Sequence, residues 1–134
     1  MKTIVNLFVI FLIVSSCEKS QTLKQSNLVL GGCNLEKKAV LKSDTIGPDT
    51  VKYTVTDNKL DIFVGINKTC CRKYSAASSI NDDIINVNIT TTHFGDCYCT
   101  CYYTFDFSFD NFSKSFKYNV YLDKELIFHG QVPH

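Results

Sequence analysis

Six of the seven cysteines are the residues best suited to chemistry in this chain. Five of them form two dense motifs, an adjacent pair and an alternating triplet: Cys70-Cys71 and Cys97-Tyr98-Cys99-Thr100-Cys101. The sixth, Cys33, stands alone nearer the N-terminus. Thiols gathered in this way either form disulfides, which persist in oxidising compartments, or hold a soft metal ion as thiolates.

Geometry restricts which disulfides can form. Cysteines two residues apart on an extended strand have Cβ atoms roughly 7 Å apart, whereas a disulfide requires about 3.8 Å. A bond between the adjacent Cys70 and Cys71 would close a strained ring. We therefore expect each cysteine of the triplet to bond either Cys33 or a member of the adjacent pair. This rule reduces the fifteen pairings of six cysteines to six.

A zinc or cuprous copper site is the alternative use of the same sulfurs. Its candidate ligands are Cys70, Cys71, Cys97, Cys99, Cys101 and His93. Structural zinc sites usually contain C-x-x-C motifs, which bring two sulfurs together around a turn, and this sequence has none. We therefore expect a disulfide framework without a metal or other cofactor, and keep copper or zinc binding as the second hypothesis.

The N-terminus has the pattern of a secretory signal peptide, with Lys2 followed by an apolar run at residues 4–14. As a helix this run would be about 16 Å long, too short for the roughly 30 Å hydrocarbon core of a membrane. Val14-Ser15-Ser16-Cys17 resembles a bacterial lipobox, so we expect removal of residues 1–16 and lipidation of Cys17. Cleavage by a general signal peptidase is the alternative, but lipidation leaves an even number of cysteines for disulfides.

The charge balance argues against a nucleic-acid partner. The chain has 14 basic and 13 acidic residues, a formal net charge of +1. Binding to DNA or RNA needs a basic surface that displaces counterions from the phosphates. Membrane attachment would come instead from lipid on Cys17, and the expected partner of the domain is an unknown protein or glycan.

Alternation of apolar and polar residues places the thiol triplet at the start of a long buried strand. From Cys97 to Phe109 the odd positions are cysteine, tyrosine or phenylalanine, and the even positions are mostly polar. A period of two is the signature of a β-strand with one buried face. The run is longer than most strands in compact domains, so we expect a bend or bulge between Tyr102 and Asp106.

Other segments show the same period, and none shows a helical one. The expected strands are residues 51–55 and 60–66, joined by a turn at 57–59, and residues 85–89, 116–122 and 126–132. The polar residues 18–27 predict a tether, with structure beginning near Leu28. The serine-rich residues 72–81 predict a loop, with a single helical turn as the alternative.

These elements predict an all-β fold: an antiparallel, immunoglobulin-like β-sandwich of about seven to eight strands. The expected organisation is a signal peptide at 1–16, a lipidated cysteine and tether at 17–27, and one domain at 28–134.

Residues that could support catalysis are sparse. The histidines are His93, His129 and His134, and none accompanies an activated thiol or a serine nucleophile motif. We therefore expect no enzymatic activity, and rank a thiol redox enzyme third. Tyr98, Tyr102 and Tyr121 lie on outward faces of the expected strands and are candidates for an exposed aromatic binding patch.

The order of the motifs resembles a family of small lipoproteins of Bacteroidetes-type bacteria. The resemblance covers roughly residues 60–132 and rests on the spacing C-C…C-x-C-x-C, with Asp83-Ile84-Ile85 between the two motifs and a strand through Tyr118 and Val120 after them. It implies an envelope location and a β-sandwich, and it brings no established activity. We therefore expect a lipid-anchored protein of the cell envelope, at the outer membrane and facing the periplasm or the surface, with a structural or binding role.

Overall fold

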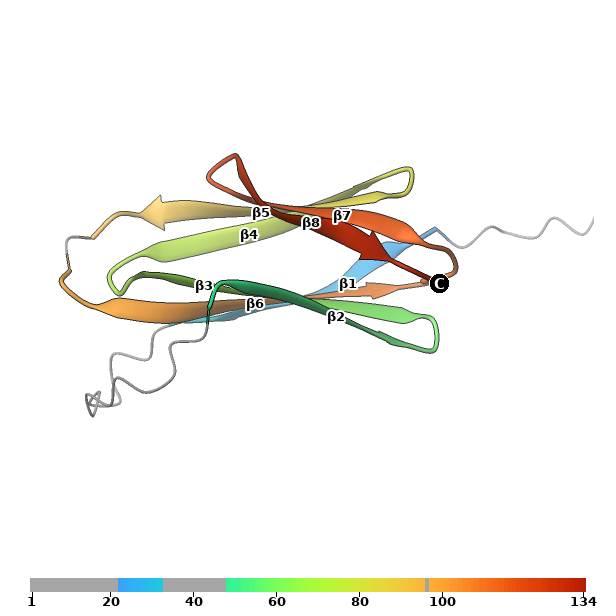
Figure 1. Ribbon diagram of the computed structural model, residues 1–134, viewed down its shortest axis with the longest axis horizontal. Helices are drawn as coiled ribbons and strands as arrows, with labels where there is room; N and C mark the ends of the chain where they lie inside the picture. The colour runs from blue at the N-terminus through green and yellow to red at the C-terminus, as the bar shows by residue number, and fades with distance from the viewer. Residues whose placement is uncertain (1–21, 33–47, 96) are drawn as a thin grey trace, which may run out of the picture.

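The computed structural model describes residues 22–32, 48–95 and 97–134, which form eight β-strands. The strands are β1 (Lys24–Gly31), β2 (Thr50–Thr56), β3 (Lys59–Thr69), β4 (Lys73–Asn81), β5 (Ile84–His93), β6 (Thr100–Asp110), β7 (Phe116–Leu122) and β8 (Glu125–Val132). They make two four-stranded sheets that lie face to face in an elongated sandwich (Figure 1). A helix long and apolar enough to cross a membrane is absent from these residues.

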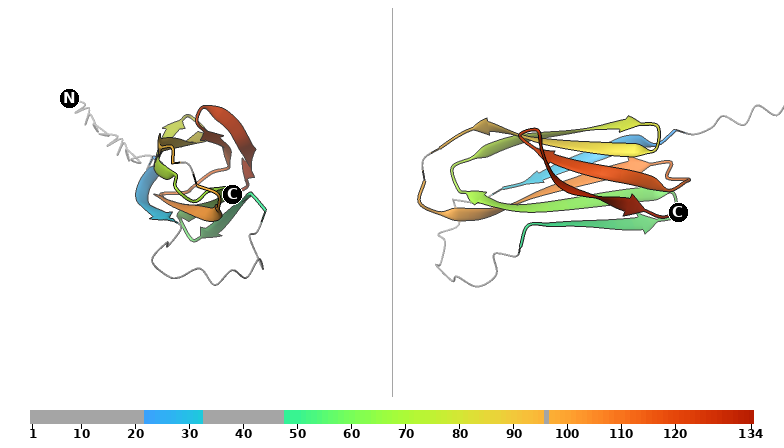
Figure 2. Two further views of the ribbon diagram at one scale, coloured as in Figure 1. Left: turned by 90° about the vertical axis from the view of Figure 1, so that its left-hand side faces the viewer. Right: turned by 45° about the horizontal axis from the view of Figure 1, so that its top comes forward.

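Each sheet combines strands that are distant in the sequence. The first sheet has the order β1-β6-β3-β2, with antiparallel neighbours throughout. The second has the order β4-β5-β7-β8, in which the central strands β5 and β7 are parallel. An immunoglobulin constant domain has the orders A-B-E-D and C-F-G. The structure is therefore a β-sandwich as predicted, but its strand order differs from the immunoglobulin order and it contains one parallel pair. Figure 2 shows the two layers from the end and from a tilted view.

Two-residue turns join three pairs of neighbouring strands. Asp57-Asn58 joins β2 to β3, where the sequence predicts a hairpin, and Asp82-Asp83 and Asp123-Lys124 join β4 to β5 and β7 to β8. The first residue of each turn is an aspartate with a left-handed φ of 52°, 53° or 50°. Short hairpins need this conformation to match the strand twist, and aspartate tolerates it better than most residues.

The core lies between the sheets and is built from alternate residues of the four central strands. The inward residues of β6 run from Cys101 to Phe109, which confirms the period of two over this part of the sequence. Almost fully buried side chains are Leu60, Ile62, Val64 and Ile66 on β3, Ile85, Val87 and Ile89 on β5, Phe105, Phe107 and Phe109 on β6, and Val120 on β7. Each contributes roughly 1.5–3 kcal/mol relative to an exposed position, so this set is the main driving force for folding.

The predicted loop at residues 72–81 is wrong, because most of it forms β4. Its residues alternate between half-buried and exposed, and the half-buried ones include Tyr74, Ala76 and Ile80. Small and hydroxylated side chains hide the period of two in the sequence. They suit this strand because β4 is an edge strand facing β1, where the Ser78 hydroxyl donates a hydrogen bond to Gln25 Oε1.

The long strand with the thiol triplet also differs from its prediction. β6 begins at Thr100, so Cys97 and Cys99 precede it. Its pairing with β3 continues without a shift from Thr100 to Asp110, so this pairing contains no bulge of the kind expected between Tyr102 and Asp106. The strand is shorter than predicted, and it therefore needs no bulge to fit the sheet.

The N-terminal boundary of the domain is earlier than predicted. β1 begins at Lys24, inside the stretch predicted as a tether, because these residues pair with the end of β6. The predicted signal peptide (1–16), Cys17 and Cys33 lie outside the described residues.

Candidate functional site

Two disulfides close one end of the sandwich, at the left of Figure 1. Cys70 bonds Cys99, and Cys71 bonds Cys97, with Cα–Cα distances of 5.5 and 5.7 Å. They link the turn between β3 and β4 to the segment that precedes β6. Both bonds are among the pairings that the sequence leaves open, and neither joins two members of the triplet.

Both adjacent cysteines can reach this segment because they lie in a turn. The register of β3 and β6 ends at the pair Thr69 and Thr100, and just beyond it the Cys70 amide donates to the Cys99 carbonyl at 3.0 Å. Within a strand, successive side chains would point to opposite faces. Gly95 passes so close to Cys71 that a Cβ at Gly95 would overlap the Cys71 Cβ, and glycine is therefore needed there.

The third cysteine of the triplet, Cys101, is buried at the start of β6. It is disulfide-bonded as well. Pairing with Cys33 stays a prediction.

Tyr103 fixes the same turn from within the core. Its hydroxyl lies 2.8 Å from the carbonyl oxygen of Cys70, 3.0 Å from that of Thr69 and 3.1 Å from that of Arg72. A hydroxyl has one proton to donate, so the three acceptors share it. Burial raises the pKa of Tyr103, and the hydroxyl therefore keeps that proton at neutral pH.

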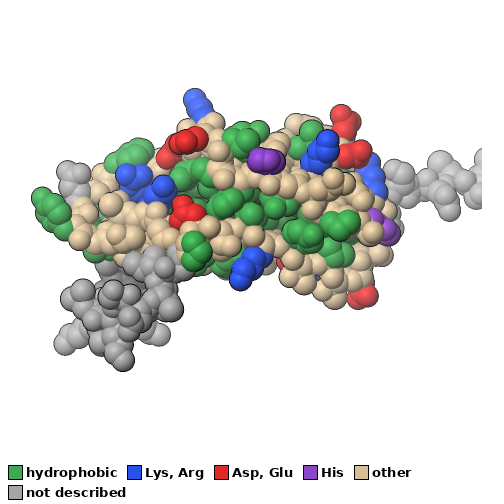
Figure 3. All heavy atoms as spheres, viewed as in Figure 1, with side chains coloured by type: hydrophobic (Ala, Val, Ile, Leu, Met, Phe, Trp, Pro, Cys, Tyr) green, Lys and Arg blue, Asp and Glu red, His purple; other side chains and the backbone are tan. Residues whose placement is uncertain are grey.

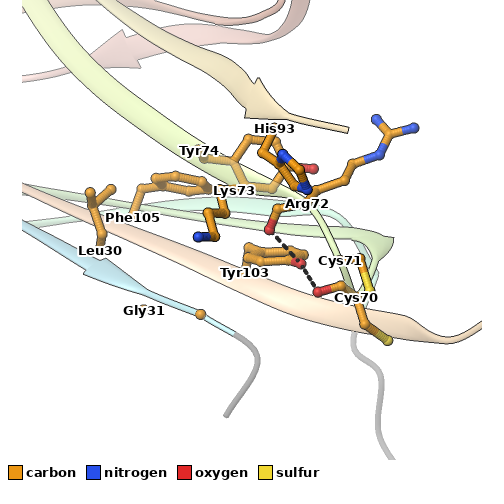
Figure 4. A pocket seen from close by; sticks show the side chains of 11 residues that line it. Leu30, Gly31, Cys70, Cys71, Arg72, Lys73, Tyr74, His93, Tyr103 and Phe105 are labelled. Atoms are coloured by element: carbon orange, nitrogen blue, oxygen red, sulfur yellow. Dashed lines mark hydrogen bonds between the residues drawn. The ribbon is translucent and has the colours of Figure 1, made fainter. Parts of the chain in front are cut away.

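A pocket of about 520 Å³ opens beside this turn, between the edge strands β1 and β4 (Figure 4). Its apolar lining includes Leu30, Tyr74, Tyr103 and Phe105. The Tyr74 ring stands edge-on to the rings of Tyr103 and Phe105, at centroid distances of 4.8 and 5.9 Å. Edge-to-face packing is favourable for aromatic rings, so this lining is already in place before anything binds.

The polar side chains around the pocket are basic or neutral. Arg72, Lys73 and His93 line it, and the described lining residues include neither aspartate nor glutamate. In Figure 4 the Arg72 guanidinium extends away from the pocket; its Nε donates to Thr69 Oγ1 at 2.9 Å and the group lies 5.4 Å from the Phe94 ring centroid. The charge of Lys73, reinforced by that of Arg72, makes the pocket electropositive.

The Tyr74 hydroxyl is buried and lacks a hydrogen-bond partner among the described residues. Burial raises the pKa of Tyr74, and the charge of Arg72 and the approach of its side chain to the hydroxyl lower this pKa to a smaller extent. An unsatisfied buried hydroxyl costs roughly 1–3 kcal/mol. It is a hydrogen-bond donor that a bound molecule could satisfy.

The alternative metal ligands are not assembled as thiolates. Cys70, Cys71, Cys97, Cys99 and Cys101 are all disulfide-bonded, and His93 lines the pocket instead. Within residues 22–32, 48–95 and 97–134, no group of three or more histidine, cysteine, aspartate or glutamate side chains is arranged to hold a metal ion.

The three tyrosines predicted as a patch do not share one surface. Tyr98 is fully exposed between the two disulfide-bonded cysteines of its segment. Tyr102 is half-buried on the outer face of the first sheet, over Gly65, and Tyr121 is half-buried on β7 of the second sheet. At the disulfide end, Tyr98 is accompanied by a second exposed ring, that of Phe94, which is 68% exposed.

Sequence reasoning does not identify most of the pocket. Arg72, Lys73 and Tyr74 fall in the stretch predicted as a loop. Tyr74 is the single aromatic residue of this stretch, and it is the signal in the sequence that could have indicated a buried position there. His129 is exposed on β8, and His134 stacks on Phe112 at a centroid distance of 5.8 Å, away from the pocket.

The opposite edge of the sandwich, formed by β2 and β8, faces the viewer in Figure 3. Hydrophobic atoms form a band across this face. The exposed apolar side chains of these two strands are Tyr53, Val55 and Leu126, with exposed fractions of 42%, 40% and 48%. This edge is apolar, but neither of its strands contributes a residue to the lining of the pocket between β1 and β4.

The fold and these features define a small β-sandwich domain, closed by disulfides at one end and carrying an aromatic, electropositive pocket beside them. No family model matches the chain, and neither a curated protein nor a solved structure is significantly similar to it.

Proposed function

We propose that this chain is an exported, lipid-anchored binding protein of the cell envelope, without enzymatic activity. The observation that carries the proposal is the pair of disulfides at the end of a small sandwich, because such bonds persist in oxidising compartments outside the cytoplasm. The signal-peptide pattern supplies the export route, and Cys17 of the lipobox supplies the anchor. The resemblance to Bacteroidetes-type lipoproteins supports the same location.

The chemistry of the pocket favours binding over catalysis. Catalysis by a nucleophile needs a thiol or hydroxyl activated by an adjacent base, whereas the cysteines beside this pocket are disulfide-bonded. Aromatic walls with a few polar groups are instead typical of ligand sites. The partner is a protein or glycan of the envelope or a ligand derived from one, and the balanced charge gives no basis for nucleic-acid binding.

Metabolic labelling with radioactive palmitate tests the anchor. Wild-type protein should incorporate label and fractionate with membranes, and Cys17→Ala should lose both properties. A matched lane with Ser16→Ala, which keeps a small residue before the cysteine, should still be labelled. Wild-type protein that is unlabelled and fully soluble would contradict the proposal.

The copper or zinc hypothesis requires the sulfurs as thiolates. Metal analysis of protein purified without chelator, combined with titration of reactive thiols, separates the two. Stoichiometric metal together with free thiols would favour the metal hypothesis over a disulfide-closed binding domain.

A further inference from the structure

We propose that the pocket between β1 and β4 binds a small amphiphilic anion: a negatively charged head group beside Lys73 and His93, and an apolar body against Leu30, Tyr103 and Phe105. The inference deepens the proposed binding role and rests on it. It does not depend on the lipid anchor, so the two can fail separately.

The apolar part of the proposal follows from the volume and walls of the pocket. A volume of about 520 Å³ lies in the range of small-molecule sites, which are largely apolar with a few placed polar groups. Tyr103 is held by its hydrogen bonds to the turn and by edge-to-face packing with Tyr74. The turn itself is bonded to the segment before β6 by both disulfides. A ligand therefore meets a wall that loses little freedom on binding.

The negative charge follows from the polar groups. Lys73 forms no ion pair with any described residue, and no carboxylate belongs to the described lining. Asp123, whose charge acts on Tyr74, already accepts hydrogen bonds from the amide and hydroxyl of Thr91. The available groups are thus cations and donors, including the unpartnered Tyr74 hydroxyl, and they complement an anion.

The position of the pocket also suits ligand capture by an anchored protein. The described chain begins at Thr22, at the end of the sandwich opposite the disulfides (Figure 1). A domain attached to a membrane at that end would present the pocket away from the surface.

Fluorescence titration with a matched pair of probes tests the inference. One probe is 8-anilinonaphthalene-1-sulfonate, an aromatic anion, and the other is N-phenyl-1-naphthylamine, which has the same aromatic body without the charge. The domain should bind the anion saturably at one site, and the neutral probe several-fold more weakly. Lys73→Gln should weaken binding of the anion about fivefold, the effect of losing a partly exposed ion pair, and leave the neutral probe unchanged.

Lys52→Gln is the control, because Lys52 is an exposed lysine on β2 that does not line the pocket. It should change neither titration. Leu30→Trp, at the half-exposed pocket mouth, should weaken both probes while circular dichroism shows an intact fold. The inference is overturned by unsaturable binding, by equal affinity for the two probes, or by equal effects of the two lysine variants. Each of these results would leave the palmitate experiment unaffected.

Discussion

Tyr103 and Tyr74 are neighbouring tyrosines with opposite hydrogen-bonding states. The Tyr103 hydroxyl donates to the turn carbonyls, 2.8 Å from the nearest, whereas the buried Tyr74 hydroxyl has no partner among the described residues. Removing a satisfied donor leaves buried acceptors unpaired, whereas removing an unsatisfied one relieves a desolvation cost. The same chemical change should therefore have opposite effects at the two positions.

We expect Tyr103→Phe to lower the free energy of unfolding by about 1–2 kcal/mol and Tyr74→Phe to leave it unchanged or raise it slightly. Urea denaturation of both variants under non-reducing conditions measures the difference. Tyr102→Phe, on the outer face of the same strand as Tyr103, controls for loss of a hydroxyl as such. Equal losses at Tyr103 and Tyr74 would show that the turn carbonyls do not depend on this donor.

Asp123 is a turn residue whose carboxylate is bound on both oxygens. Oδ1 accepts from the Thr91 amide and Oδ2 from the Thr91 hydroxyl, each at 2.7 Å, and these hydrogen bonds lower the pKa of Asp123. A carboxyl group whose folded-state pKa is lowered stabilises the fold above its unfolded pKa of about 3.9, and this contribution is lost as pH falls through the folded value.

Asp123→Asn should therefore cost roughly 0.5–1 kcal/mol at pH 7, a modest loss because the site is exposed to solvent. Asparagine tolerates the left-handed backbone of this turn, so the variant tests the charge and its hydrogen bonds. The gap between variant and wild type in the free energy of unfolding should narrow as the pH falls below the unfolded pKa and through the lower folded pKa of Asp123. Asp57→Asn, in the equivalent position of the β2–β3 turn, should show no such gap.

The two disulfides link the same two segments, so their contributions to the free energy of unfolding should not be additive. When the other bond is absent, either disulfide closes a loop with a sequence separation of 29 or 26 residues. In the chain-entropy model this raises the free energy of unfolding by about 3.5 kcal/mol. With one bond in place, the second closes a ring of only about five residues, Cys70, Cys71 and Cys97 to Cys99, and contributes roughly 2 kcal/mol.

Replacing both cysteines of one bond by alanine should therefore cost about 2 kcal/mol. Removing both bonds should cost more than the sum of the two single effects, by about 1.5 kcal/mol. A double-mutant cycle of Cys70→Ala/Cys99→Ala with Cys71→Ala/Cys97→Ala, followed by chemical denaturation, measures this coupling. Strictly additive losses would indicate that the bonds act through local packing and not through a shared loop.

The strands that the sequence predicts well are those with large side chains on one face. β2, β3 and β7 are recognisable because valine, isoleucine and aromatic residues alternate with polar ones. In β4 the inward positions include Ala76 and Ser78, whose small side chains carry little hydrophobic signal. Because the sequence does not predict β4, it also does not predict the pocket, whose lining includes the first two residues of that strand, Lys73 and Tyr74.

The order of the strands depends on pairings between distant segments, which alternation does not encode. β1 pairs with β6 across most of the chain, and β5 lies parallel to β7. Alternation identifies the buried face of each strand but is the same for a parallel and an antiparallel neighbour. The sequence could therefore predict a two-layer sandwich and a link between its cysteine motifs, but not which strand stands beside which.

The two ends of the sandwich have different characters, and this asymmetry predicts how an anchored protein would stand on a membrane. Thr22 follows Cys17 by five positions, a reach of about 17 Å at most. β3 and β6 have 11 residues each, so the opposite, disulfide-closed end lies roughly 36 Å further along the strands. An acylated Cys17 would hold the Thr22 end near the bilayer and the pocket away from it.

The chain contains no tryptophan, so single tryptophans can report the orientation of lipidated protein in vesicles with brominated acyl chains. Ser113→Trp marks the anchor end, where Asn111 Nδ2 donates to the Thr22 carbonyl at 3.3 Å. Tyr98→Trp marks the disulfide end at a fully exposed position. We expect stronger quenching at position 113 than at 98, because bromine quenches only tryptophans that approach the acyl chains. Equal quenching at both sites, or stronger quenching at 98, would show that the domain lies along the membrane or inserts its disulfide end, and the pocket would then face lipid.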